Sequence, residues 1–241
     1  WTAGTCLLAV AVAAGAALLR GGVTAFQPTI VTADLDAMRA SLAAVPAVAP
    51  DPNGDVAGPA PAPAGMPHPA RRARRMDPSA RAPAPGPRVI GAHLEGPFVS
   101  PERPGAHDPS AIRPPDPAAL DALLASGPMS QVTLAPELPG APALIDALVA
   151  RGVTVSLGHT EADAATAHRA FDRGARAVTH LFNAMRRPAP RDPCIAFAAL
   201  GREDVFITLI VDGHHLADDA VRTAWRAAGD HLVLISDAVA A

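Results

Sequence analysis

The sequence has 241 residues, a hydrophobic content of 49% and a formal net charge of −3 at pH 7. This length and apolar content suffice for the core of one barrel-type domain, and the small negative charge does not indicate a nucleic-acid partner or an acidic membrane surface. The two cysteines, Cys6 and Cys194, have neither the spacing of a metal-binding pair nor that of a disulfide framework, so a reducing, cytoplasmic setting is expected.

The first predicted element is an apolar, Ala-rich run over residues 6–19. It is shorter than the roughly 20 residues that a membrane-spanning helix needs, and no basic region precedes it, so neither a membrane span nor a signal peptide is expected. We predict a helix of the domain that ends at Gly21 and Gly22.

Residues 46–87 differ in kind from the rest of the chain. They contain 12 of the 27 prolines, an arginine cluster and almost no large apolar side chains. Such a segment cannot bury enough surface to offset the entropy of ordering, so we predict a disordered insertion in a single domain that otherwise spans residues 1–241. A contact patch for an anion, formed by its arginines, is the alternative.

The remaining sequence alternates between β-rich runs and stretches that can form helices. The seven predicted strands lie at residues 23–32, 88–93, 131–134, 154–157, 177–180, 205–211 and 231–235. One predicted helix spans residues 160–174, with Thr160 as its cap and Gly174 closing it. Apolar strands that alternate with helices indicate a parallel sheet covered on both faces.

Ionisable residues follow the predicted strands at the point where each ends. They are Glu95, His159, His180, the pair His214 and His215, and Asp237. A doubly wound sheet builds its site near one switch point, whereas a (β/α)₈ barrel builds it from the carboxyl ends of many strands. Five strands with polar ends therefore favour a barrel.

His159 and His180 are 21 residues apart, a gap that one helix and one strand fill, so the two imidazoles come from neighbouring strands. With Glu95 they form a His-His-carboxylate set, which suits a single catalytic Zn²⁺ or, alternatively, Fe²⁺ or a similar ion. Asp237 would then act as the base on a water molecule.

Each of these residues also has a structural interpretation. A single histidine at a strand end can be a satisfied polar group, Glu95 can cap a loop, and Asp237 can cap a helix. Asp212 can shape a turn, and His168 is expected to face solvent. The whole set on one face of one fold favours the functional interpretation.

Seven motifs occur in the order and approximate spacing of one enzyme family. They are GAHLEGPF at 91–98, GAHD at 105–108, TLAPE at 133–137, SLGHT at 156–160, VTHLFNAM at 178–185, DGHH at 212–215 and SDA at 236–238. Together they resemble the N-acetylglucosamine-6-phosphate deacetylases of the amidohydrolase superfamily. The resemblance implies a metal-dependent amide hydrolase on a (β/α)₈ TIM-type barrel, which forms glucosamine 6-phosphate and acetate.

The resemblance also implies a role for particular residues. The implied metal ligands are Glu95, His159 and His180. The implied catalytic residues are Asp237, which moves the proton, and His107, which polarises the acetyl carbonyl. The implied substrate contacts are Ala106, His107, Asn183, Ala184, Arg191 and His215, of which Arg191 and His215 contact the phosphate. In the family the arginine can reach a neighbouring subunit, which implies a homodimer.

The chain also departs from the family pattern. The family's first barrel strand and its accessory β-sandwich have no counterpart in this sequence, so we expect an incomplete barrel, truncated at both ends. Cys194 and Phe197 stand where the family favours glycine, which would narrow the phosphate end of the pocket. Another amidohydrolase, such as a deaminase or cyclic amidase, and a non-catalytic remnant are the alternatives.

Overall fold

The computed structural model describes residues 25–45 and 88–237. The predicted helix at 6–19 and the predicted insertion at 46–87 lie outside the described residues.

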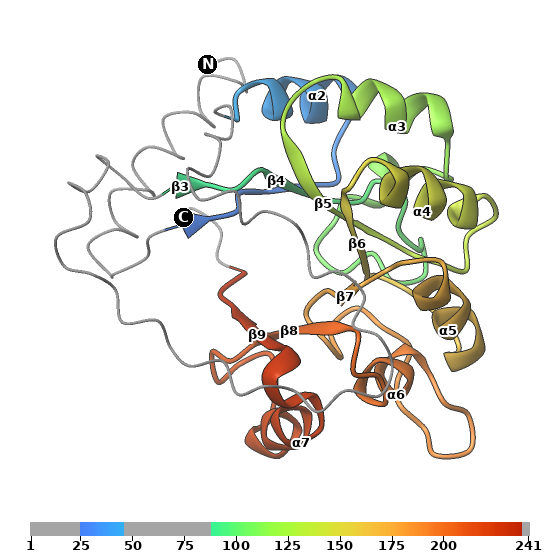
Figure 1. Ribbon diagram of the computed structural model, residues 1–241, viewed down its shortest axis with the longest axis vertical. Helices are drawn as coiled ribbons and strands as arrows, with labels where there is room; N and C mark the ends of the chain where they lie inside the picture. Colours follow the sequence, from blue (N-terminus) through green and yellow to red (C-terminus); the bar gives the residue numbers. More distant parts are fainter. Residues whose placement is uncertain (1–24, 46–87, 238–241) are drawn as a thin grey trace, which may run out of the picture.

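Seven strands form one parallel sheet in the order in which they occur along the chain (Figure 1). They are β2 (Thr29–Val31), β4 (Ala92–Glu95), β5 (Met129–Leu134), β6 (Thr154–Leu157), β7 (Ala177–Val178), β8 (Phe206–Ile210) and β9 (Leu232–Ile235). Each strand pairs with the next without a reversal of order, whereas a doubly wound sheet reverses at its switch point. The fold is therefore a partial (β/α) barrel of the TIM type, as the sequence predicted.

A second, two-stranded sheet pairs β1 (Ala25–Phe26) with β3 (Arg88–Val89). Two predicted strands are thus each divided in two. Pro28, which has no N–H to donate, precedes β2, and Gly91, with a φ of 103°, separates β3 from β4.

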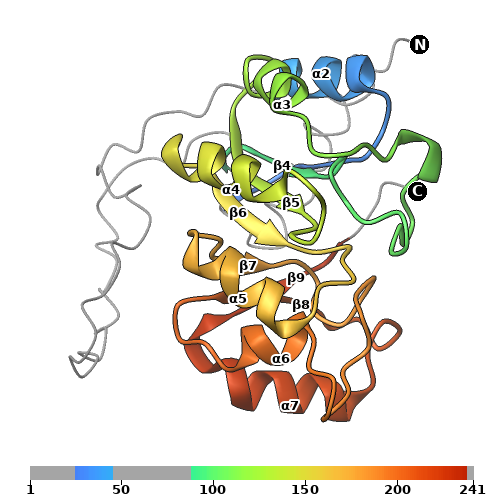
Figure 2. The ribbon, with the colours of Figure 1, turned by 90° about the vertical axis from the view of Figure 1, so that its right-hand side faces the viewer.

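The helices pack along the outer side of the strands (Figures 1 and 2). They are α2 (Leu35–Ala43), α3 (Pro117–Leu124), α4 (Ala141–Ala150), α5 (Ala164–Asp172), α6 (Ile195–Leu200) and α7 (Asp218–Ala228), with the 3₁₀ turns η1 (Pro109–Ala111) and η2 (Gly229–His231). None of the helices described is long and apolar enough to cross a membrane.

Aspartate side chains start three of these helices. Asp34, Asp116 and Asp163 each accept a hydrogen bond from a backbone N–H in the first turn of α2, α3 and α5. The predicted cap of α5 at Thr160 is wrong, because the hydroxyl of Thr160 accepts from Ala162 N and donates to the Glu137 carboxylate instead. Gly174 closes the helix as predicted, with a φ of 113°.

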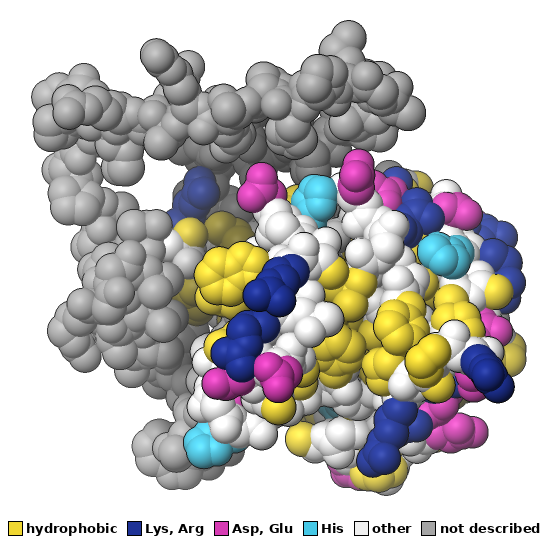
Figure 3. Space-filling model, turned by 90° about the horizontal axis from the view of Figure 1, so that it is seen from below, with side chains coloured by type: hydrophobic (Ala, Val, Ile, Leu, Met, Phe, Trp, Pro, Cys, Tyr) yellow, Lys and Arg dark blue, Asp and Glu magenta, His cyan; other side chains and the backbone are white. Residues whose placement is uncertain are grey.

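The core is one cluster of buried apolar side chains shared by strands and helices. Leu94, Val132 and Leu157 come from the strands, and Leu144 and Phe171 come from α4 and α5. The surface carries both signs of charge close together, as Figure 3 shows for one face. For example, Arg202 pairs with both Asp172 and Asp204.

Candidate metal centre

The predicted site residues lie at the carboxyl ends of the strands. Glu95 is the last residue of β4, while His159, His180 and Asp237 each follow two residues after the end of β6, β7 and β9. The last three all have left-handed backbone, with φ values of 48°, 34° and 46°. The predicted strand at 177–180 ends at Val178, and the chain turns left-handed at His180.

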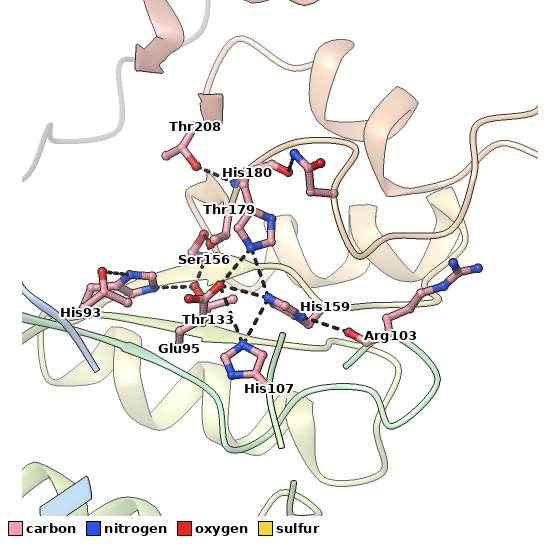
Figure 4. A network of polar contacts seen from close by, with 12 residues as sticks. His93, Glu95, Arg103, His107, Thr133, Ser156, His159, Thr179, His180 and Thr208 are labelled. Atoms are coloured by element: carbon pink, nitrogen blue, oxygen red, sulfur yellow. Dashed lines mark hydrogen bonds and ion pairs between the residues drawn. The ribbon is translucent and has the colours of Figure 1, made fainter. Parts of the chain in front are cut away.

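Four buried side chains bring donor atoms together at this end of the sheet (Figure 4). Glu95 Oε1 lies 3.0 Å from His159 Nε2 and 2.9 Å from His180 Nε2, and the two imidazole nitrogens are 3.1 Å apart. His107 Nε2 lies 3.2 Å from His159 Nε2 and 4.0 Å from Glu95 Oε1. The donor atoms of Glu95, His159 and His180 thus lie close together, although the three residues come from different strands.

The charge of the cluster is fixed by these contacts. Burial raises the pKa of Glu95, but the close imidazoles of His159 and His180 outweigh this effect and hold the pKa of this carboxyl well below its ordinary value. Burial lowers the pKa of His180, and the hydrogen bond and charge of Glu95, with the charge of Asp237, raise it overall. Glu95 is thus an anion at neutral pH.

The other ring nitrogen of His159 shows which nitrogen carries its proton. Nδ1 lies 2.9 Å from the carbonyl oxygen of Arg103. A carbonyl only accepts, so Nδ1 is the protonated nitrogen, and in the neutral ring Nε2 carries a lone pair. This is the arrangement by which proteins orient a metal-ligating histidine.

These residues fit a divalent metal ion. The donor atoms of Glu95, His107 and His159 lie within 4.8 Å of one another and are buried, and His180 Nε2 adjoins two of them. The anionic oxygen of Glu95 and the imidazole nitrogens lie within contact distance of one another, an arrangement that a bound cation stabilises. The buried His180 Nδ1 has no hydrogen-bond partner among the described residues.

A chain of hydrogen bonds joins five strands beside the donor atoms. His93 Nε2 lies 2.6 Å from Thr133 Oγ1, which lies 2.7 Å from Thr179 Oγ1, and Ser156 Oγ lies 2.6 Å from the same Thr179 atom. His93 Nδ1 contacts Thr29 Oγ1 at 3.1 Å. Burial lowers the pKa of His93 to about 4, so this ring is neutral, and it forms hydrogen bonds with side chains inside the sheet.

The remaining predicted site residues lie on the loops beyond the same strand ends. Ala106 is exposed, next to the buried His107. Asn183 donates to the carbonyl oxygen of His180 at 3.2 Å, and Ala184 has a φ of 48°. Asp237 is exposed, and its negative charge helps to raise the pKa of His180.

Arg191 and His215, the predicted phosphate contacts, are both exposed. His215 Nδ1 pairs with Asp212 at 2.7 Å, and the other oxygen of Asp212 accepts from the backbone N–H groups of His214 and His215. Asp212 therefore shapes its turn. Cys194 is buried at the start of α6, whereas Phe197 is exposed.

Sequence reasoning missed several residues that support the site. Glu137 accepts from Glu161 N at 2.7 Å as well as from the Thr160 hydroxyl, which ties the loop after β5 to the loop that carries His159. Thr208 accepts from His180 N at 2.7 Å. The only signal for such residues is a hydroxyl or carboxylate within or just after an otherwise apolar strand.

The chain is similar to known deacetylases over most of its length. It is 38% identical to N-acetylglucosamine-6-phosphate deacetylase of Bos taurus over 93% of this chain and 49% of that protein. It is 33% identical to N-acetylgalactosamine-6-phosphate deacetylase of a Shewanella strain over 90% of this chain and 47% of that protein. No protein-family model matches the chain.

Solved structures agree with this similarity. The crystal structure of N-acetyl-D-glucosamine-6-phosphate deacetylase from Mycobacterium smegmatis superposes with a TM-score of 0.70 at 33% identity, over 90% of this chain and 49% of that one. A mutant of the same protein, solved in complex with N-acetyl-D-glucosamine-6-phosphate, gives a TM-score of 0.68. The chain spans about half the length of the proteins it matches. It is a homologue of the N-acetylglucosamine-6-phosphate deacetylases.

Proposed function

We propose that this chain carries the metal centre of an enzyme that hydrolyses the acetamide of N-acetylglucosamine 6-phosphate to glucosamine 6-phosphate and acetate. The observation that carries the proposal is the convergence of Glu95, His159 and His180 at the carboxyl ends of three strands. The similarity to deacetylases over most of the chain supports it.

Glu95, His159 and His180 would hold one divalent ion, and zinc suits this oxygen and nitrogen donor set. The bound ion would acidify a water molecule and neutralise negative charge that develops on the acyl oxygen. The anionic Glu95 lowers the net charge of the occupied site, and the Arg103 carbonyl keeps His159 Nε2 free to bind.

The other residues act on the proton and the substrate. Asp237 takes a proton from the attacking water and gives it to the leaving amine. Asn183, Ala184 and Ala106 contact the sugar, while Arg191 and His215 supply positive charge and N–H donors for the phosphate. We also propose that the protein acts as a cytoplasmic homodimer, in which an arginine can reach the neighbouring site.

N-acetylgalactosamine 6-phosphate is a second candidate substrate, because one of the relatives is a deacetylase of that sugar phosphate. The two sugars differ in the configuration of the C4 hydroxyl, which takes no part in the hydrolysis of the acetamide. The two candidates therefore share the same mechanism.

The test measures acetate release from both sugar phosphates by the protein that carries this chain, together with its metal content. We expect about one divalent ion per metal centre, faster hydrolysis of N-acetylglucosamine 6-phosphate, and loss of activity on chelation that added Zn²⁺ restores. Preference for the galactosamine substrate supports the second candidate instead. Metal binding without hydrolysis of either would identify a non-catalytic remnant and overturn the proposal.

A further inference from the structure

His107 is ambiguous if distance alone is considered. Its buried Nε2 lies 3.2 Å from His159 Nε2 and within the group of donor atoms that could hold a metal ion. By distance it would count as a fourth ligand. A ligand must present a lone pair, however, so the position of the proton on this ring decides what it does.

The contact with Thr32 shows which nitrogen of His107 carries the proton. Its backbone N–H donates to His107 Nδ1 over 3.2 Å, and the bond is buried. A backbone N–H can only donate, so Nδ1 holds the lone pair and, in the neutral ring, Nε2 holds the proton.

The neighbouring histidine has the opposite arrangement. His159 Nδ1 donates to the Arg103 carbonyl, so its Nε2 faces the cluster with a lone pair. His107 Nε2–H faces that lone pair at 3.2 Å. Two backbone groups of opposite polarity thus hold two adjacent rings as opposite tautomers, which suits one ring to bind metal and the other to donate a hydrogen bond.

Thr32 is itself anchored to a proposed ligand. Its hydroxyl donates to the backbone carbonyl oxygen of Glu95 at 2.9 Å. A Cβ atom at Gly96, which has a φ of 86°, would lie 2.0 Å from this hydroxyl oxygen, so only glycine leaves room for the contact. The same residue therefore holds the end of β4 and the ring of His107.

We propose that Thr32 is a positioning residue: its backbone N–H holds His107 as the Nε2–H tautomer, and its hydroxyl fixes this contact to the end of β4. Held in this way, His107 presents an N–H, and not a lone pair, to the cluster, as the donor role that the resemblance implies for it requires. The identity of the acceptor rests on the proposed function, whereas the tautomer and the ligand count do not. They can therefore be tested without turnover.

The first experiment is ¹⁵N NMR of the imidazoles in the intact chain, free and loaded with Zn²⁺. We expect an unprotonated Nδ1 and a protonated Nε2 for His107 in both states, with a scalar coupling between His107 Nδ1 and Thr32 N across the hydrogen bond. His159 should show the reverse pattern in the free state. A protonated Nδ1 on His107, or loss of its Nε2 proton on zinc binding, overturns the proposal.

Two variants of Thr32 test its side chain. Thr32→Val keeps the shape and removes the hydroxyl that donates to Glu95, and it should weaken the coupling and give a mixture of His107 tautomers. Thr32→Ser keeps the donor and should retain the wild-type pattern. An unchanged His107 tautomer in Thr32→Val shows that the side chain does not position the ring.

Zinc affinity separates the donor role from a ligand role. His107→Gln can place an amide N–H near the position of Nε2, and its zinc affinity should stay within about threefold of the wild type, whereas His159→Gln should lose more than about 100-fold. Comparable losses in both variants would make His107 a ligand. If neither the wild type nor the variants bind zinc, the proposed function fails while the NMR result on the free chain still decides the tautomer.

Discussion

Five non-glycine residues among those described have left-handed backbone: His159, His180, Phe182, Ala184 and Asp237. Such conformations cost about 1–3 kcal/mol each and persist only where neighbouring contacts enforce them. His180 N donates to Thr208 Oγ1, and Thr160 N donates to the carbonyl oxygen of Ala184. These strained residues lie just after the strand ends that carry the candidate site. There, the left-handed backbone can direct side chains toward the site.

The roles proposed for Asp237 and His180 can be separated by substituting each residue. Asp237→Asn keeps the shape and removes the proton acceptor, so metal content should stay near the wild-type value while turnover falls by at least about 100-fold. His180→Ala removes a metal donor, so metal content itself should fall. Metal analysis and acetate-release assays on both variants measure metal content and turnover. Near-normal turnover of Asp237→Asn would make Asp237 a structural residue.

The elements show how much the sequence could predict. The predicted strand at 154–157 coincides with β6. The alternation of apolar strands with helices predicted the parallel sheet, and the polar ends of five strands favoured the barrel, whose strands lie in sequence order. The cap of α5 was misplaced, because Thr160 and Asp163 can both accept from a first-turn N–H and only the position of Glu137 decides between them.

The site shows a similar division. That Glu95, His159 and His180 lie together could be predicted, because ionisable residues at the ends of apolar strands are conspicuous. The contacts that hold them were missed, since a backbone carbonyl such as that of Arg103 has no signal in the sequence. A threonine in or beside a strand, such as Thr32, is likewise indistinguishable from one chosen for β propensity.

Close packing between α2 and the turn after α3 gives a prediction at the level of elements. A Cβ atom at Gly127 would lie 2.1 Å from the backbone carbonyl oxygen of Leu42, near the end of α2. Backbone cannot yield as a side chain can, so Gly127→Ala should lower the free energy of unfolding by about 2 kcal/mol or more.

Gly201→Ala is the matched control, because its Cβ would come no closer than 3.4 Å to other atoms and its φ is −88°. It should change the free energy of unfolding by less than about 0.5 kcal/mol. Urea denaturation of both variants makes the comparison. Equal effects would show that the approach of Gly127 to α2 does not limit packing.

For the whole molecule, the buried histidines predict how stability changes with pH. The pKa of His93 is about 4 in the folded chain against 6.5 when unfolded, so between these values the unfolded chain binds more protons. The buried neutral ring of His93 makes its full contribution to the free energy of unfolding above pH 6.5. This contribution decreases by roughly 3 kcal/mol as the pH falls to 4. His107 acts in the same direction.

Two other groups modify this profile. The lowered pKa of Glu95 adds stability above the ordinary carboxyl range that is lost at lower pH, whereas the raised pKa of His180 adds stability below pH 6.5 that is lost as the pH rises through its folded value. Urea denaturation midpoints of the metal-free chain from pH 4 to 8 test the combined effect of these groups on stability. His93→Gln should flatten the slope between pH 6.5 and 4, and an unchanged slope would contradict the assignment.

Among the described strands that carry or precede candidate site residues, β9 has the most exposed side chains. Val233 and Leu234, which point to opposite faces, are 41% and 66% exposed, whereas the side chains of β4 are buried. Few buried contacts allow a segment to open locally while the rest stays folded. Asp237 follows β9, whereas Glu95 ends the buried β4, and His159 and His180 follow the largely buried β6 and β7. Hydrogen exchange on this chain should therefore show β9 opening well below the urea midpoint, and zinc should stay bound after the Asp237 carboxylate has left its place.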